Sequence, residues 1–305
     1  MTGFQTSGES GFMLNASVVM TTFNRKEVVD KAVKAVLKQK FPARFELVVV
    51  DGGSTDGTVE LLEKLKGRKN LAIINDGKRL SACAGRNKAI SLAKNEVIVV
   101  MDDDCIPEKE WLTKLVAPFD DSKIGMTSSF SLWGGTSTAF RKKFLEGIGG
   151  FDEDYGYYRE DTDLVLKCLE QGFERIMVNA RFHHDHKLEN PKGGFIGLIK
   201  HGLKRTRYHR NDPLFFKKHP NKLAKQFLHV KFGFIVDPLE DFKAATGTWW
   251  DSKRKPQLSS PQGLVFLENK SILHEAAIII LATAYVIAVK SQRLFGSVKA
   301  GKLLL

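Results

Sequence analysis

Between residues 16 and 102 the sequence alternates four short apolar runs with segments of helical periodicity. Apolar or β-branched side chains fill nearly consecutive positions in the runs, which are residues 16–22, 45–51, 71–76 and 96–102. A strand that is apolar on both faces has to be covered on both faces, and strands separated by helices usually pair in parallel. The alternation therefore predicts an α/β domain in which helices cover both sides of a parallel sheet.

Beyond residue 124 this alternation weakens. Residues 124–140 have the pattern of two strands around a Gly-Gly turn, which indicates a mixed sheet. We expect four segments: a flexible tail, an α/β domain, a basic region, and an apolar helix with a basic tail. Their predicted boundaries are 1–15, 16–186, 187–270 and 271–305.

The formal net charge of +12 is concentrated in one window. Residues 187–225 hold eleven Lys or Arg against two acids, a net charge of +9, with aromatic residues interleaved. Such a window suits an anionic partner, although a solvated basic face would also explain it. The chain has no recognisable DNA- or RNA-binding motif, so we expect no nucleic-acid partner.

The three cysteines are far apart and form no CxxC pair. They indicate neither a disulfide framework nor a zinc site, and they favour a reducing compartment. The N-terminal residues lack the basic and apolar regions of a secretory signal. These features predict a cytoplasmic protein.

Residues 276–289 form an apolar run of 14 residues near the C-terminus. As a helix this run would be about 21 Å long, whereas a spanning helix needs roughly 20 residues. Four basic residues follow it: Lys290, Arg293, Lys299 and Lys302. The pattern favours a helix lying in the interface of an anionic membrane, which would make the protein peripheral on the cytoplasmic membrane face. A buried helix and a membrane span are the alternatives.

Polar residues follow each of the four predicted strands. In open α/β sheets, ligands bind at the carboxyl ends of the strands. The residues expected there are Thr22, Asn24, Asp51, Asp76, Asp102, Asp103 and Asp104. The alternative for Asn24 and Asp51 is a role in caps and turns.

Three adjacent carboxylates at a strand end repel one another. A divalent cation removes this conflict, and Mg²⁺ or Mn²⁺ combines one or two carboxylates with phosphate oxygens. Asp102, Asp103 and Asp104 therefore suit a site for a metal and a diphosphate together. The alternative is an acidic turn that caps a helix near residues 107–116.

Five segments in order carry a resemblance to a known family: VVMTTFNR, LVVVDGGSTDGT, GRNKAI, VIVVMDDDCIPEKEWL and GGTSTAFRKKFLEGIGGFDEDYGYYREDTDLVLKCLEQGF. Together they resemble the inverting nucleotide-sugar glycosyltransferases of family 2, over roughly residues 16–186. The resemblance implies the GT-A (nucleotide-diphospho-sugar transferase) fold. This is a Rossmann-like mixed sheet covered by helices, here with a helical C-terminal appendage.

The resemblance also implies a donor site. Asp51 matches the contact to the nucleotide base, and Thr22 and Asn24 lie in the loop that wraps the nucleotide. Arg86 lies near the phosphates, and we group Asp76 with these residues. In the DxD motif, Asp102 contacts ribose or metal and Asp104 is the firmest ligand of Mn²⁺ or Mg²⁺, which leaves Asp103 as the acid expected to tolerate change best.

On the acceptor side the resemblance makes Asp161 the general base, accompanied by Glu160, Gly134 and Gly135. A direct displacement needs such a carboxylate to take the proton of the acceptor hydroxyl. Acids at residues 160–163 would also suit the start of a helix, so at least one is expected to be structural.

His184, within the segment RFHHDHK, is the expected histidine ligand of the metal, in preference to His183 and His186. The alternative is a set of solvent-exposed histidines at a strand end.

The resulting prediction is a metal-dependent transferase that moves one sugar from a UDP- or GDP-sugar to a glycan or polyprenyl-linked acceptor at a membrane. Residues 16–186 would form its catalytic domain, and residues 187–270 would face the acceptor and the membrane. The QxxRW motif of processive synthases is missing from the sequence, which favours transfer of a single sugar. One alternative is a polyprenyl-phosphate monoglycosyltransferase. Another is a catalytically dead module that binds a nucleotide or a glycan.

Overall fold

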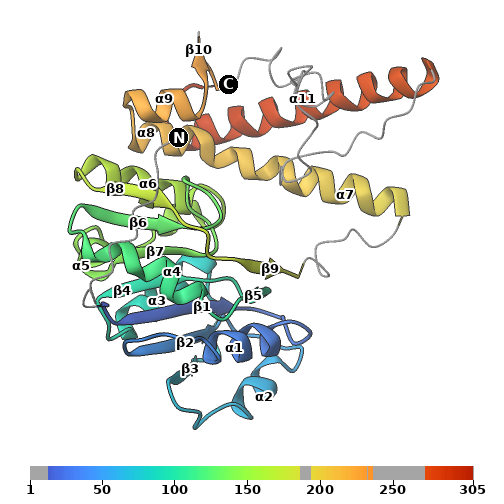
Figure 1. Cartoon of the computed structure of the whole chain (residues 1–305). Coiled ribbons are helices and arrows are strands. Elements are labelled where there is room, and N and C mark those ends of the chain that lie inside the picture. Colours follow the sequence, from blue (N-terminus) through green and yellow to red (C-terminus); the bar gives the residue numbers. More distant parts are fainter. Residues whose placement is uncertain (1–12, 186–193, 232, 236–271, 305) are drawn as a thin grey trace. The chain divides into compact units, whose positions relative to one another are not determined.

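The computed structural model describes residues 13–185, 194–231, 233–235 and 272–304 (Figure 1). The chain divides into two compact units, Met1–Asn190 and Pro191–Leu305.

A seven-stranded sheet with the order β3-β2-β1-β4-β7-β6-β8 forms the centre of the first unit. The strands β3, β2, β1 and β4 pair in parallel, β7 is antiparallel to both of its neighbours, and β8 is parallel to β6. Their bounds are β1 Ala16–Thr22, β2 Phe45–Asp51, β3 Leu71–Asn75, β4 Val97–Val100, β6 Ile124–Ser128, β7 Thr138–Arg141 and β8 Glu174–Met177. The predicted α/β class and mixed sheet are confirmed.

Helices cover both faces of this sheet, because successive strand residues point into opposite cores. On β1, Val18 and Met20 face one apolar cluster and Val19 faces the other. The helices are α1 Val29–Leu37, α2 Thr58–Glu63, α3 Ala82–Leu92, α4 Trp111–Val116, η1 Ala117–Asp120, α5 Lys142–Gly147, η2 Glu153–Tyr155 and α6 Glu160–Glu170.

The loops after β1 and β2 are held together by Asn24, for which the sequence offered a role as a helix cap. Asn24 accepts a hydrogen bond from the Thr55 amide at 2.8 Å, and its own amide donates to Ser54 Oγ at 2.8 Å. Helix α1 begins only at Val29, after a residue that provides no side-chain cap. The predicted capping role of Asn24 is therefore wrong, since its side chain links the two loops.

The hairpin predicted for residues 124–140 is confirmed as β6 and β7, with the two glycines between them. A second, two-stranded sheet was not predicted. It pairs β5 (Cys105–Pro107) with β9 (Phe182–His184) in antiparallel register, directly after the acids that follow β4.

The second unit is mainly helical, as expected for the C-terminal appendage. Its elements are α7 Gly194–Thr206, η4 Arg207–Asn211, α8 Asp212–Lys218, α9 Lys222–Phe227, β10 Val230–Lys231, β11 Phe234–Ile235 and α11 Ile272–Ala300. Helix α11 packs against η4 and α8. A buried ion pair joins Arg293 Nε to Asp212 Oδ2 at 3.0 Å, and His209 Nδ1 lies 3.1 Å from the same oxygen. Parts of the predicted 187–270 and 271–305 segments thus pack together within this unit.

Helix α11 is 29 residues long, twice the length of the apolar run from which it was predicted. One side is buried at Val289, Arg293, Ser297 and Ala300. Large apolar side chains are exposed at Ile280, Leu281, Ile287, Leu294, Phe295 and Val298. Within the described ranges, no helix combines the length and the apolarity needed to cross a membrane.

Candidate active site

The three acids after β4 have different surroundings. The side chain of Asp102 is 37% exposed, whereas Asp103 and Asp104 are buried. Arg25, from the loop after β1, reaches both buried acids, with its Nε 3.8 Å from Asp103 Oδ1 and its Nη1 3.7 Å from Asp104 Oδ2. Asp102 therefore differs from the other two acids in its exposure. Asp103 and Asp104 share Arg25 as a partner.

Burial changes the expectation for Asp103. It raises the pKa of Asp103 to about 7, against the opposing effect of Arg25. The sequence suggested that Asp103 would tolerate change best, and its burial argues against that expectation. Asp102 is the most open of the three acids.

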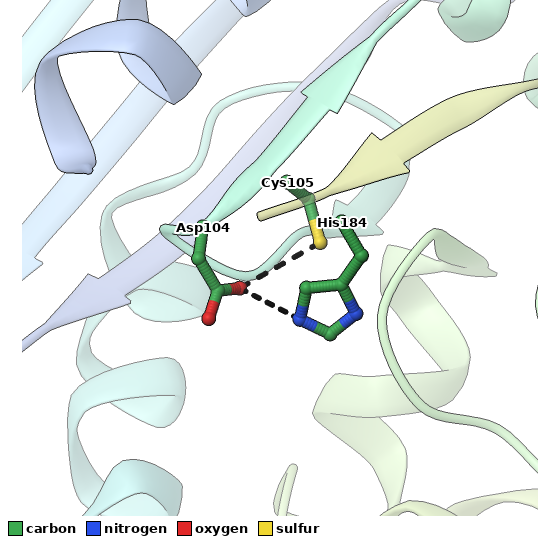
Figure 2. A group of neighbouring side chains, drawn as sticks. All are labelled: Asp104, Cys105 and His184. Carbon is green, nitrogen blue, oxygen red and sulfur yellow. Dashed lines mark hydrogen bonds and ion pairs between the residues drawn. The ribbon is translucent and has the colours of Figure 1, made fainter. Parts of the chain in front are cut away.

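The pairing of β5 with β9 brings His184 to Asp104. Cys105 is directly opposite His184 in this register, and His184 Nε2 lies 3.0 Å from Asp104 Oδ1 (Figure 2). His183 is opposite Ile106 and exposed, and His186 is outside the described residues. Of the two described histidines in the segment RFHHDHK, His184 is the one that the structure places beside the acid.

The charge of Asp104 is favoured by this arrangement. Burial alone would raise the pKa of Asp104, but the hydrogen bond and charge of His184, together with Arg25, outweigh burial and hold the pKa below its usual value. An ionised carboxylate beside an imidazole is a suitable donor set for a divalent cation. The ligand atoms of Asp104, Cys105 and His184 all lie within 4.8 Å of one another. Asp104, Cys105 and His184 are therefore the described residues that could hold an ion at this point.

Arg86 of α3 is a buried residue that connects the acids after β4 with those at the start of α6. Its Nη2 lies 3.2 Å from Asp102 Oδ1, and its Nη1 lies 3.1 Å from Glu160 Oε1 and 3.7 Å from Asp161 Oδ1. Burial would lower the pKa of Arg86, but the three acids outweigh burial and raise it. Arg86 is therefore a permanent cation, and Asp102 is directed toward it.

Asp161 is in the first turn of α6, where a negative charge is favoured by the helix dipole. The two residues before the helix, Tyr158 and Arg159, have φ angles of 74° and 82°. This strained backbone is of the kind that concentrates at functional sites. The side chain of Asp161 is 27% exposed, and the effect of burial outweighs that of Arg86 and raises its pKa to about 7. A carboxylate with this pKa is suited to accept a proton near neutral pH.

One of the two hairpin glycines, Gly134, packs closely against Asp161. A Cβ on Gly134 would lie 2.8 Å from Asp161 Cβ, and a Cβ on Gly135 would lie 2.9 Å from the ring of Phe130. Both glycines have positive φ, of 88° and 107°. Of the predicted acceptor-side residues, Gly134 therefore packs against Asp161 and Glu160 contacts Arg86, whereas Gly135 packs against Phe130.

Asp51 and Thr22 are directly opposite each other in the β1–β2 pair, and both are buried. Asp51 Oδ2 accepts hydrogen bonds from the amides of Gly53 and Ser54 at 2.9 and 2.8 Å. Its Oδ1 is buried without a hydrogen-bond partner among the described residues. A buried carboxylate oxygen without a partner is costly, and a ligand that donates a hydrogen bond would satisfy it.

Asp76 lies apart from this group. It follows β3, which is separated from β4 by β2 and β1, and it forms an ion pair with Lys88. The structure thus brings Arg86 together with Asp102 and Asp161, and Asp104 together with His184, but it does not place Asp76 with either set.

Two residues of the site were missed by the sequence analysis, Arg25 and Cys105. Arg25 directly follows Asn24 in the first predicted binding loop, so its position was a usable signal. The approach of Cys105 to His184 depends on a strand pair between distant segments, for which the sequence offered no signal.

The architecture is that of the GT-A glycosyltransferases. The solved mannosyltransferase PcManGT from Pyrobaculum calidifontis, in complex with GDP-Man and Mn²⁺, matches over 96% of this chain and 91% of that chain with a TM-score of 0.61 at 18% identity. The sequence model described as Glycosyl transferase family 2 matches residues 17–169, half of the chain. The chain belongs to glycosyl transferase family 2.

Curated relatives support this assignment. Glycosyltransferase AglE of Haloferax volcanii is 30% identical over 112 residues, 36% of this chain and 37% of AglE. The putative teichuronic acid biosynthesis glycosyltransferase TuaG of Bacillus subtilis is 31% identical over 201 residues, 65% of this chain and 76% of TuaG. The match thus spans little more than a third of the length of AglE.

Proposed function

We propose that the protein is a metal-dependent inverting glycosyltransferase that moves a single sugar from a nucleotide-sugar to a glycan or lipid-linked acceptor at a membrane surface. The carrying observation is the position of Arg86, whose guanidinium contacts both Asp102 and Asp161. It joins the acids at the donor end of the sheet to the carboxylate suited to act as a base. The donor would therefore bind on the Asp102 side of Arg86 and the acceptor on the Asp161 side.

The proposed donor is a UDP- or GDP-sugar. Related folds have been solved with such ligands: PcManGT with GDP-Man and Mn²⁺, and TarS residues 1–349 of Staphylococcus aureus with UDP, at a TM-score of 0.50. In this chain Asp51 Oδ1 is available to accept a hydrogen bond from the base. Asp104 and His184 would hold Mn²⁺ or Mg²⁺, with Asp102 contacting the ribose or the metal. The bound ion would stabilise the charge of the departing diphosphate.

Asp161 would act as the general base. It would take the proton of the acceptor hydroxyl while that oxygen bonds to the anomeric carbon and the bond from this carbon to the diphosphate breaks. A direct displacement of this kind inverts the anomeric centre. Arg86 stays protonated and would offset the negative charge that gathers around the reacting atoms.

The acceptor side of the proposal depends on the second unit. Ile280, Ile287, Leu294 and Val298 are exposed at a spacing of seven, seven and four residues, which places them on one side of α11. An exposed apolar helix side in a basic segment suits the interface of an anionic membrane. We therefore propose peripheral contact with the cytoplasmic membrane face and an acceptor of the polyprenyl-linked type.

Calorimetry with UDP-, GDP- and dTDP-sugars, each with and without Mn²⁺, tests the donor site. We expect metal-dependent binding of one nucleotide class, lost in Asp104→Ala and retained in Asp161→Asn. Transfer to added acceptors should be lost in both variants. If no nucleotide binds with or without Mn²⁺, the transferase proposal fails. If Asp161→Asn transfers sugar at the wild-type rate, Asp161 is not the base.

Sedimentation with vesicles tests the membrane contact. The protein should sediment with vesicles that contain phosphatidylglycerol and much less with phosphatidylcholine alone. Ile287→Asp should weaken this binding, whereas Leu92→Asp, at an exposed apolar position on α3, should not. Equal loss in both variants, or none in either, would exclude α11 as the contact.

A further inference from the structure

Cys105 is a buried thiol for which the proposed reaction has no use. It is opposite His184 in the antiparallel β5–β9 pair, and directly opposed residues of such a pair project to the same side of the sheet. Its Sγ lies 3.8 Å from Asp104 Oδ1, the same oxygen that lies 3.0 Å from His184 Nε2. In Figure 2 the thiol and the imidazole both point toward this carboxylate.

The three side chains form a compact set of sulfur, nitrogen and oxygen donors. Within the described part of the chain, they are the group of His, Cys, Asp or Glu residues whose ligand atoms come close enough to share an ion, at no more than 4.8 Å from one another. Neither of the other two cysteines belongs to such a close group of donors. The Cys83 thiol lies 3.9 Å from the Gly156 carbonyl oxygen, and Cys168 packs with apolar side chains. Cys105 alone among the three cysteines lies within the proposed metal site.

The chemistry of these donors differs from that of an all-oxygen site. Mn²⁺ and Mg²⁺ prefer oxygen ligands, whereas Zn²⁺ and Co²⁺ bind well to thiolate and imidazole. Zinc sites with three protein ligands are usually four-coordinate, which leaves a single open position. An octahedral ion held by one or two side chains leaves several positions for diphosphate oxygens.

We propose that Cys105, Asp104 and His184 form a three-ligand site that binds Zn²⁺ and Co²⁺ more tightly than Mn²⁺ or Mg²⁺, so that zinc displaces the catalytic ion and inhibits transfer. The proposal rests on the metal site of the proposed function. Uptake of the ion releases the thiol proton to solvent. The thiol thus sets the metal preference of the site.

Cobalt absorption spectroscopy on the full chain tests the thiol directly, because a cobalt–thiolate bond gives a near-ultraviolet charge-transfer band. The chain has three cysteines in all, so a Cys83→Ser/Cys168→Ser double variant leaves Cys105 as its single thiol. We expect the band at one equivalent of Co²⁺ in wild type and in the double variant, and its loss in Cys105→Ser. The double variant assigns the band even if Cys105→Ser does not fold.

Competition between metals supplies the affinity. Zn²⁺ should displace Mn²⁺, and the electron paramagnetic resonance signal of free Mn²⁺ measures this displacement. Cys105→Ser should weaken Zn²⁺ binding at least about tenfold and change Mn²⁺ binding little. Cobalt binding without the charge-transfer band in wild type would overturn the proposal, as would an unchanged zinc affinity in Cys105→Ser. If Mn²⁺ supports transfer but the band is absent, only this inference fails. If neither ion binds, the metal site of the proposed function fails with it.

Discussion

Arg86 Nη1 lies 3.7 Å from Asp161 Oδ1, so the proposed base faces a buried cation. Burial raises the pKa of Asp161 to about 7, and Arg86 opposes that rise. The same guanidinium contacts Asp102 at 3.2 Å on the donor side. The protonation of the proposed base is therefore linked electrostatically to Asp102 in the proposed donor site.

This relationship predicts the pH dependence of transfer. Asp161 accepts a proton only when it is ionised, so kcat/KM should rise with pH and reach half of its plateau near pH 7. Arg86→Met removes the cation that favours the carboxylate, and the midpoint should move to higher pH. Arg86→Lys keeps the charge and should move it less. A midpoint that is the same in Arg86→Met and wild type would contradict this electrostatic link.

The same pKa predicts a stability cost at the base. The folded-state pKa of Asp161 is raised from the ordinary value of 3.8 to about 7. The contribution of Asp161 to the free energy of unfolding is therefore fully present below pH 3.8 and is lost as pH rises toward 7. Asp161→Asn avoids this loss. Its free energy of unfolding should exceed that of wild type by an amount that grows between about pH 4 and 7 and is of the order of a few kcal/mol.

Urea unfolding at pH 5, 6, 7 and 8 measures this difference. The control is Asp120→Asn, at an exposed acid on η1. This control should show no comparable growth with pH. A difference for Asp161→Asn that shrinks as pH rises would show that the sign is wrong.

Gly134→Ala tests the close contact of the hairpin with the base. The new Cβ would meet Asp161 Cβ at 2.8 Å at a residue with φ of 88°, so either the hairpin or the base has to move. We expect kcat to fall at least about tenfold, since misplacement of reacting groups is costly. Nucleotide affinity should stay within a factor of about two if the effect is confined to the base.

Gly147→Ala is the matched control, because a Cβ at Gly147 meets nothing within 4 Å and the residue ends α5 without a positive φ. It should retain wild-type transfer. An unchanged kcat in Gly134→Ala would show that Asp161 does not depend on this contact.

The fold of the first unit was predictable because its signals are local. Each of its four parallel strands is a short apolar run, and the acids at Asp51 and Asp102 directly follow such runs. The partners of those acids were less predictable, since they come from distant segments. Arg86 reaches Glu160 from 74 residues away, and Cys105 meets His184 through a strand pair of three residues. Neither approach leaves a periodic pattern in the sequence.

The helix-cap role suggested for Asn24 failed for a similar reason. An Asn before a helical pattern is a good local signal for a cap. In the structure its side chain bonds to Thr55, in a loop that is 31 residues away. A tertiary contact thus replaced the local one, and only the folded arrangement of the two loops reveals it.

The close packing at Gly296 leads to a prediction about the stability of α11 within the second unit. A Cβ at this position would lie 2.1 Å from the Arg210 carbonyl oxygen, so α11 packs directly against the backbone of η4. Gly296→Ala should force the two apart and lower the free energy of unfolding of this unit by about 1–3 kcal/mol, as overpacking does. Arg293 lies one turn before Gly296 on α11, and its buried ion pair with Asp212 of α8 should be strained as well.

Gly202→Ala is the control, because Gly202 is inside α7 and a Cβ there meets nothing within 4 Å. Alanine at such a helical position should be neutral or stabilise by up to about 1 kcal/mol. Hydrogen exchange of the α11 amides measures both variants, and protection should fall in Gly296→Ala alone. Vesicle binding should weaken in that variant too, since the exposed apolar side of α11 depends on the helix being held in place. Full protection of α11 in Gly296→Ala would mean that the contact with Arg210 does not hold the helix.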